Sequence, residues 1–160
     1  NPTFTYSEVG SYDVKLKISN ATQVDSLIKY DYITVSYVPP EEPQNVEIVL
    51  SNEDANITWD AVTQTIHSTP ITPDGYVVYY NEYNDDRYLF LAFTTETSLT
   101  HYNVVRFADQ MFYRVVAYID LSREQILYFE ELNNSREKVR WEEVEEKIYK
   151  WRKKWKKFSL

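Results

Sequence analysis

The sequence contains no cysteine, only two glycines and only two histidines in 160 residues. Without cysteine, the chain has no disulfide, no thiolate metal site and no cysteine nucleophile. Many extracellular proteins carry disulfides, so this absence favours either the cytosol or a bacterial surface. Two glycines are too few for a glycine-rich phosphate-binding loop. No apolar run approaches the roughly 20 residues that a membrane-spanning helix needs.

Aromatic residues are abundant. They make up 16% of the chain, with 15 Tyr and 4 Trp, and the hydrophobic fraction is 43%. Aromatic and β-branched side chains suit the half-buried surface of strands, so the composition predicts a folded, mainly β protein. The chain starts at Asn1 with neither a signal peptide nor an initiator methionine. We therefore expect a mature fragment or an excised piece of a longer protein.

The net charge of −8 is distributed unevenly. Residues 44–120 carry 3 basic and 11 acidic groups, a net of −8. Residues 121–160 carry 11 basic and 8 acidic groups, a net of +3, and the first 43 residues supply the remaining −3. This asymmetry suggests separate elements with separate partners.

The first 38 residues predict a β-hairpin. Apolar residues fall at every second position in 12–18, which is the period of a strand with one buried face. A turn-prone stretch follows at 19–22, and a second strand is expected over 30–35. The sequence Pro-Pro-Glu-Glu-Pro at 39–43 then predicts a stiff polar linker after the first domain.

This hairpin resembles the second half of a PKD domain. The resemblance covers about 38 residues and rests on N-P-x-F-x-Y at 1–6, G-x-Y-x-V-x-L at 10–16 and I-x-V at 33–35. The family usually has His at the position of Phe4. Its W-x-F-G-D-G signature, which belongs to the first half of the domain, is missing. The resemblance implies that the parent protein continues upstream.

From residue 44 onward, short strand signals recur between turn residues, which predicts a β-sandwich. Trp59 is expected to be a large core anchor on the same face as Ile57. The strand that opens at Gly75 is apolar on both faces, which predicts a central position in its sheet. The six strands are expected over residues 45–50, 55–60, 75–82, 87–93, 97–104 and 110–119.

Residues 44–119 resemble a fibronectin type III domain. The resemblance rests on a first strand led by Pro43, I-T-W at 57–59, G-Y-x-V-Y at 75–79 and Y-x-V-x-A at 113–117. The family's corner tyrosine falls on Met111, and no seventh strand follows Tyr118. The resemblance implies an Ig-like sandwich with one unpaired sheet edge, which we expect the helical tail or a neighbouring segment to cover.

After residue 120 the period changes to that of a helix. Ser122 and Gln125 predict a capping box at the start of a short helix that ends at 133–134. A second helix is expected from about residue 135 to the C-terminus, with glutamates first and Lys/Arg last, which matches the helix dipole. Its apolar stripe indicates packing against another surface. The stripe consists of Trp141, Val144, Ile148, Trp151, Trp155 and Phe158.

No residue pattern predicts catalysis. His67 and His101 have no partner in a recognisable nucleophile or metal motif, so we expect no enzyme and no cofactor. The loop at 81–86 is rich in oxygen ligands, and Asp85 and Asp86 are its candidates for a hard cation such as Ca²⁺. The alternative for this loop is a solvated hairpin turn.

The end of the second helix combines six basic groups and three aromatic residues over 150–158. One interpretation is a basic amphipathic helix that contacts anionic lipid. The interpretation we favour is docking on the acidic sandwich or on another chain. No base-reading motif predicts nucleic-acid binding. The partner-binding candidates are the six residues of the stripe together with Lys153, Lys154, Lys156 and Lys157.

The sequence thus predicts a partial PKD-like domain (1–38), a linker (39–43), a fibronectin type III-like sandwich (44–120) and a charged helical tail (121–160). We expect a non-catalytic spacer or protein-interaction module of a larger secreted or cell-surface protein, bacterial or archaeal. Two alternatives stay open. One is a self-assembling subunit completed by exchange of a strand or helix between chains. The other is a polysaccharide-binding accessory module of a secreted enzyme.

Overall fold

The chain forms two compact units, divided between Tyr37 and Val38. The described residues of the first unit are 3–6 and 10–37, and the second unit is Val38–Lys154. The computed structural model describes residues 3–6, 10–83, 85, 87–106, 110–135 and 137–154.

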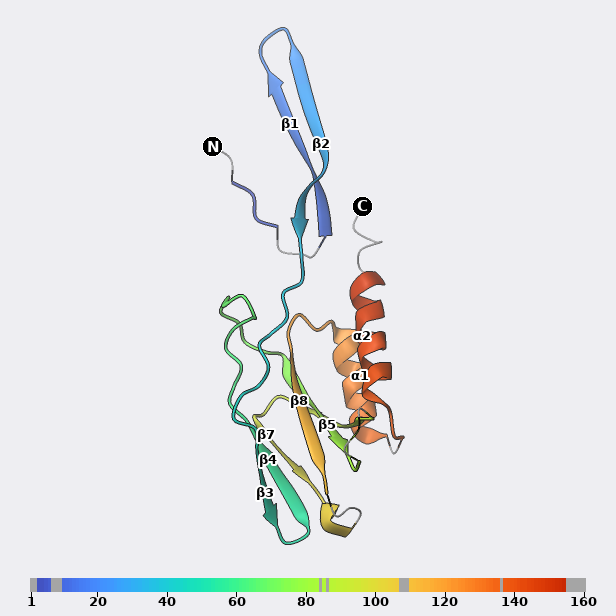
Figure 1. Ribbon diagram of the computed structural model, residues 1–160. Helices are drawn as coiled ribbons and strands as arrows, with labels where there is room; N and C mark the ends of the chain where they lie inside the picture. Colours follow the sequence, from blue (N-terminus) through green and yellow to red (C-terminus); the bar gives the residue numbers. More distant parts are fainter. Residues whose placement is uncertain are drawn as a thin grey trace. The chain divides into compact units, whose positions relative to one another are not determined.

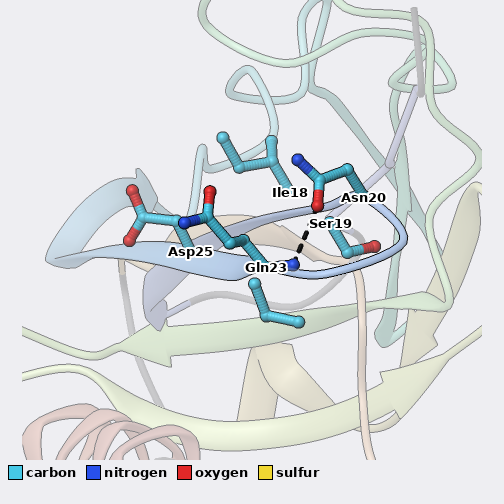
Figure 2. A pocket seen from close by; sticks show the side chains of 6 residues that line it. Ile18, Ser19, Asn20, Gln23 and Asp25 are labelled. Atoms are coloured by element: carbon cyan, nitrogen blue, oxygen red, sulfur yellow. Dashed lines mark hydrogen bonds between the residues drawn. The ribbon is translucent and has the colours of Figure 1, made fainter.

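The described part of the first unit is dominated by a β-hairpin (Figure 1). β1 (Gly10–Ser19) pairs antiparallel with β2 (Val24–Val35). Asn20 holds the turn, because its Oδ1 accepts the backbone N–H groups of Thr22 and Gln23 at 3.0 and 2.8 Å. Figure 2 shows the bond from Gln23. Asparagine favours such turns because its side chain mimics a backbone acceptor. β2 begins earlier than predicted, since pairing continues down to this turn.

The second unit contains a β-sandwich of two three-stranded antiparallel sheets. One sheet has the order β3-β4-β7, with β3 (Glu47–Ser51), β4 (Asp54–Thr58) and β7 (Ser98–His101). The other has the order β6-β5-β8, with β5 (Gly75–Asn81), β6 (Leu89–Thr94) and β8 (Phe112–Tyr118). A short 3-10 helix, η1 (Val104–Arg106), follows β7. This strand order is that of the first six strands of an Ig-like, fibronectin type III sandwich. The predicted fold class is confirmed.

A first apolar core lies between the two sheets. Trp59 is buried, as predicted, and its ring meets that of Tyr76 edge-on with centroids 5.4 Å apart. The Tyr76 hydroxyl accepts the backbone N–H of Val62 at 3.1 Å, which ties the loop after β4 to β5. This core also contains Ile57, Val78, Val115 and Ala117.

Two helices cover the other face of the β6-β5-β8 sheet (Figure 1). α1 (Arg123–Asn134) begins at the predicted capping box, in which Gln125 N donates to Ser122 Oγ at 3.3 Å and Ser122 N donates to Gln125 Oε1 at 2.8 Å. α2 (Trp141–Lys154) packs beside it. A second core forms between helices and sheet, so β5 is buried on both faces, as its sequence predicts. This core contains Val77, Tyr79, Phe90, Tyr118, Phe129, Val144 and Ile148.

The chain between the helices extends β6 along its outer edge. Phe90 N donates to Val139 O at 2.8 Å, and Trp141 N donates to Tyr88 O at 2.9 Å. The second helix therefore starts at Trp141 and not near residue 135, because this stretch pairs as a strand. The structure also corrects the expectation that the helical tail covers the sheet edge beside Tyr118. The described helices cover a face of the sheet, and their connection occupies the opposite edge.

Residues 39–43, predicted as a linker, are bonded to the sandwich. Pro40 forms a β-bridge with Thr65, and Glu41 N donates to Gln64 O at 3.0 Å. Pro43 is buried. The segment connects the two units, but it is part of the second one and does not separate them as a free spacer.

Candidate functional site

β8 is an edge strand of its sheet. It pairs with β5 along its whole length, from the Gly75–Tyr118 pair to the Asn81–Phe112 pair. No strand among the described residues pairs along its other side. An edge of this kind presents backbone N–H and C=O groups that another strand can pair with. In Ig-like sandwiches the last strand lies here.

β3, in the opposite sheet, has an apolar inner face that the described residues leave uncovered. Ile48 and Leu50 pair directly with Ile57 and Ala55 of β4, so all four side chains point to the inner face. Ile57 and Ala55 are 0% and 1% exposed, whereas Ile48 and Leu50 are 46% and 63% exposed. No β3 residue belongs to the core between the sheets.

These two features meet at one place, which we call the open strand position: the outer edge of β8 together with the inner face of β3. The first and last strands of an Ig-like sandwich lie at facing edges of its two sheets. Residues 139–141 already pair with the outer edge of β6. A further strand that covers the inner face of β3 therefore has to join this sheet at its other edge, beyond β8. An extended segment at this position would pair with β8 and bury Ile48 and Leu50. The sequence predicted the unpaired edge but not these two side chains.

A histidine–tyrosine contact joins the two sheets, between β7 and β8. His101 Nδ1 lies 2.9 Å from the hydroxyl oxygen of Tyr113, and its ring is 5.1 Å from that of Tyr80. Burial lowers the pKa of His101, although the charge of Glu82 opposes this shift. Burial also raises the pKa of Tyr113 to about 12. The pair is therefore neutral at pH 7 and acts as a half-buried polar contact. His67 is an exposed residue of the turn after Thr65.

The helix layer is fastened to the sheet by a cluster of hydroxyl and carboxylate groups. The Tyr118 hydroxyl donates to Glu145 Oε1, and the Tyr79 hydroxyl lies 3.5 Å from both partners. Burial is the main cause that raises the pKa of Tyr79 and of Tyr118 above the ordinary value, and the charge of Glu145 adds to it. Both hydroxyls therefore stay protonated and serve as donors, which gives this cluster a structural role.

Part of the apolar stripe predicted to bind a partner lies inside the protein. Val144 and Ile148 are fully buried in the second core, which corrects their assignment as partner-binding candidates. Trp141 lies under the Arg114 guanidinium, 4.7 Å from the ring centroid, and Trp151 meets Tyr128 edge-on at 5.3 Å. Both tryptophans are partly exposed. No described helix is long and apolar enough to span a membrane.

The remaining candidates of the helical tail fall at the limit of what the structure describes. Lys153 and Lys154 belong to the last turn of α2, but only their backbone is described. Trp155, Lys156, Lys157 and Phe158 lie outside the described residues.

The candidate cation loop is a turn closed by its own side chains. The Asp85 carboxylate accepts from Arg87 Nε at 2.6 Å and from Asn81 Nδ2 at 2.9 Å. The hydrogen bond from Arg87 is the main cause that lowers the pKa of Asp85 to about 2. A carboxylate already paired with a guanidinium is a poor ligand for a cation. Asp86 lies outside the described residues, and the described ones contain no group of three metal-ligating side chains.

A shallow hollow lies at the tip of the hairpin (Figure 2). It is lined by Ile18, Ser19, Asn20, Gln23, Val24 and Asp25. Its polar atoms serve the turn itself, since Asn20 Oδ1 accepts three hydrogen bonds and Asp25 Oδ1 accepts the backbone N–H of Ser26 at 2.8 Å. The hollow follows from the turn, and we assign no site to it.

No protein-family model matches the chain, and no curated protein matches it. A solved structure with a similar fold is the crystal structure of domains A168–A170 from titin, with 19% sequence identity and a TM-score of 0.44. The match covers 69% of this chain and 36% of the titin chain, so this chain spans about a third of that structure. The class assigned here, an Ig-like sandwich of the fibronectin type III kind, rests on the strand order described above.

Proposed function

We propose that this chain is a non-catalytic Ig-like module that binds an extended protein segment at the open strand position. The observation that carries the proposal is the difference in burial between two neighbouring strands. On the same face of the sheet, Ile48 and Leu50 of β3 are exposed, whereas Ile57 and Ala55 of β4 are buried. Such a patch beside an unpaired strand edge is suited to strand addition. In that mode, main-chain hydrogen bonds supply affinity and alternate side chains supply specificity.

The bound segment must satisfy two requirements at once. Its backbone has to pair with β8, and each net hydrogen bond contributes about 1 kcal/mol. Its side chains have to be apolar at every second position, because only alternate side chains of a strand face the same side. Each of the exposed side chains of β3 would then contribute about 1 kcal/mol by burial of its remaining apolar surface. A polar or charged segment would lose this second contribution.

This module is proposed to act as a spacer or protein-interaction unit of a larger cell-surface or secreted protein. The support for this context is the arrangement of the chain in two compact units, one of which is an Ig-like sandwich. The two units are joined near a proline-rich stretch that contains Pro39 and Pro40. A fold does not determine a function, so the binding site proposed at the open strand position is the part of the proposal to test first.

Selection of peptides from a displayed random library against the full chain tests the proposal. We expect enriched peptides with apolar residues at alternate positions, and we expect the double variant Ile48→Glu with Leu50→Glu to lose their binding. Val49→Glu is the matched control, because Val49 is exposed on the opposite face of the same strand. Failure to enrich any peptide, or equal binding to the double variant, would overturn the proposal.

A further inference from the structure

We infer that the segment filling the open strand position is β1 from the hairpin of a second copy of this chain. The inference rests on the proposed strand-acceptor function and names its partner. In the assembly, the partner copy's β1 continues the β6-β5-β8 sheet beyond β8, and its β2 follows as the next strand. The hairpin enters intact, because β1 pairs with β2 along one side and no other strand of the described residues pairs with its second side.

The apolar face of the hairpin matches the open strand position. Val14, Leu16 and Ile18 alternate along β1 and therefore share one face. Leu16 and Ile18 are 59% and 60% exposed, and Leu27, the cross-strand partner of Leu16, is 57% exposed. Contiguous exposed apolar side chains of this size mark an interaction surface. Placed beside β8 with this face inward, they would cover Ile48 and Leu50.

The hairpin also has the right length to pair with β8. β1 has 10 residues and β8 has 7, so β1 can pair along the whole of β8. A two-stranded hairpin without a third strand or a covering layer is marginally stable in water. Docking on a sheet edge supplies both a third strand and a covering layer, so the hairpin and the sandwich stabilise each other.

The charges do not oppose the docking. Val38–Lys154 carries 21 acidic and 12 basic groups, a net of −9. The hairpin over residues 10–35 carries three Lys and three Asp, a net of 0. The like charge of two sandwiches disfavours their direct association, and the neutral hairpin meets no such repulsion.

A second copy fits better than the hairpin of the same molecule. Residues that precede proline are biased toward extended backbone, and Val38 and Pro39 both precede prolines. Pro39 O already accepts the backbone N–H of Ile66 in the sandwich at 3.1 Å, so only residues 36–38 connect the end of β2 to that anchored point, and three residues span at most about 10 Å. A connection this short and stiff restricts how far the hairpin can move along its own sandwich. Two copies can instead exchange hairpins reciprocally, and such an exchange closes as a symmetric dimer.

Light scattering on the full chain, separated by size-exclusion chromatography at several concentrations, tests the inference. We expect a dimer whose fraction rises with concentration. Leu16→Glu with Ile18→Glu removes the donor face, and Ile48→Glu with Leu50→Glu removes the acceptor face, so each double variant alone is expected to be monomeric. A mixture of the two is expected to form a mixed dimer, because one supplies an intact acceptor and the other an intact donor.

Val49→Glu is the control on β3 and is expected to keep the dimer. The donor variant changes only the hairpin, so its result stands even if the acceptor variant is less stable. A strict monomer at every concentration overturns the inference, and so does a donor variant that still dimerises. If the chain stays monomeric while selected peptides still bind the open strand position, the second-copy partner is wrong and the strand-acceptor function stands.

Discussion

Ile48 and Ile57 are cross-strand partners on the same face of one sheet, yet Ile57 is fully buried and Ile48 is 46% exposed. The difference comes from the opposite layer, which covers β4 but ends before β3. Substitutions at these two positions therefore test whether a further strand covers β3 in solution.

Ile57→Ala should lower the free energy of unfolding by about 2–5 kcal/mol, because it leaves a cavity in a packed core. Ile48→Ala should cost less than about 1 kcal/mol, because its side chain already contacts water. Urea unfolding followed by tryptophan fluorescence measures both values, at a protein concentration low enough to keep the chain monomeric. Equal losses would mean that another segment covers β3.

Gly75→Ala should destabilise the sandwich by about 1–3 kcal/mol, since it overpacks a fixed contact. A Cβ at Gly75 would lie 2.5 Å from the ring of Phe93 and 2.9 Å from the carbonyl oxygen of Thr94. The ring can move, but the backbone oxygen belongs to the paired strand β6. Gly10→Ala is the control, because its Cβ would meet nothing closer than 3.7 Å. Equal melting temperatures for the two variants would contradict this prediction.

Tyr118→Phe should weaken the attachment of the helices by about 1–2 kcal/mol, because it removes a hydrogen bond to the Glu145 carboxylate. Tyr128→Phe, in the same helix layer, is the control, because the contacts of Tyr128 with Trp151 and Lys147 involve its ring and survive the loss of the hydroxyl. Amide hydrogen exchange in α2 reports the effect locally. Faster exchange in both variants, or in neither, would show that the hydroxyl of Tyr118 is not what holds α2.

The free energy of unfolding should fall as the pH is lowered below about 6.5, the ordinary pKa of histidine. Burial lowers the pKa of His101 in the folded state, so the unfolded chain binds a proton first and is stabilised by it. The free energy of unfolding stops changing with pH below the pKa of His101 in the folded state, because His101 is then protonated in both the folded and the unfolded chain. His101→Gln should flatten this part of the profile, and His67→Gln, at an exposed position, should not. Denaturant titrations between pH 5 and pH 8 provide the measurement.

Several features of the chain follow from local sequence alone. The alternation in residues 12–18, the capping box of Ser122 and Gln125, and the apolar strand after Gly75 each predicted the observed element. These predictions succeed because strand period, helix capping and turn chemistry depend on residues close together in the chain. The strand order of the sandwich also agrees with the resemblance to fibronectin type III domains. The identity of residues 1–38 as part of a PKD domain stays a prediction.

Tertiary structure alone decided which surfaces are covered. The sequence of β3 does not distinguish Ile48 from a core residue, because its exposure depends on a layer formed by strands far along the chain. In the same way, residues 139–141 form a strand-like pairing instead of helix because the edge of β6 lies beside them. The stripe of α2 predicted a packed helix but not its partner, since an apolar stripe fits any apolar face. The burial of a side chain depends on which part of the chain packs against it, and that packing is decided by contacts between residues far apart in the sequence.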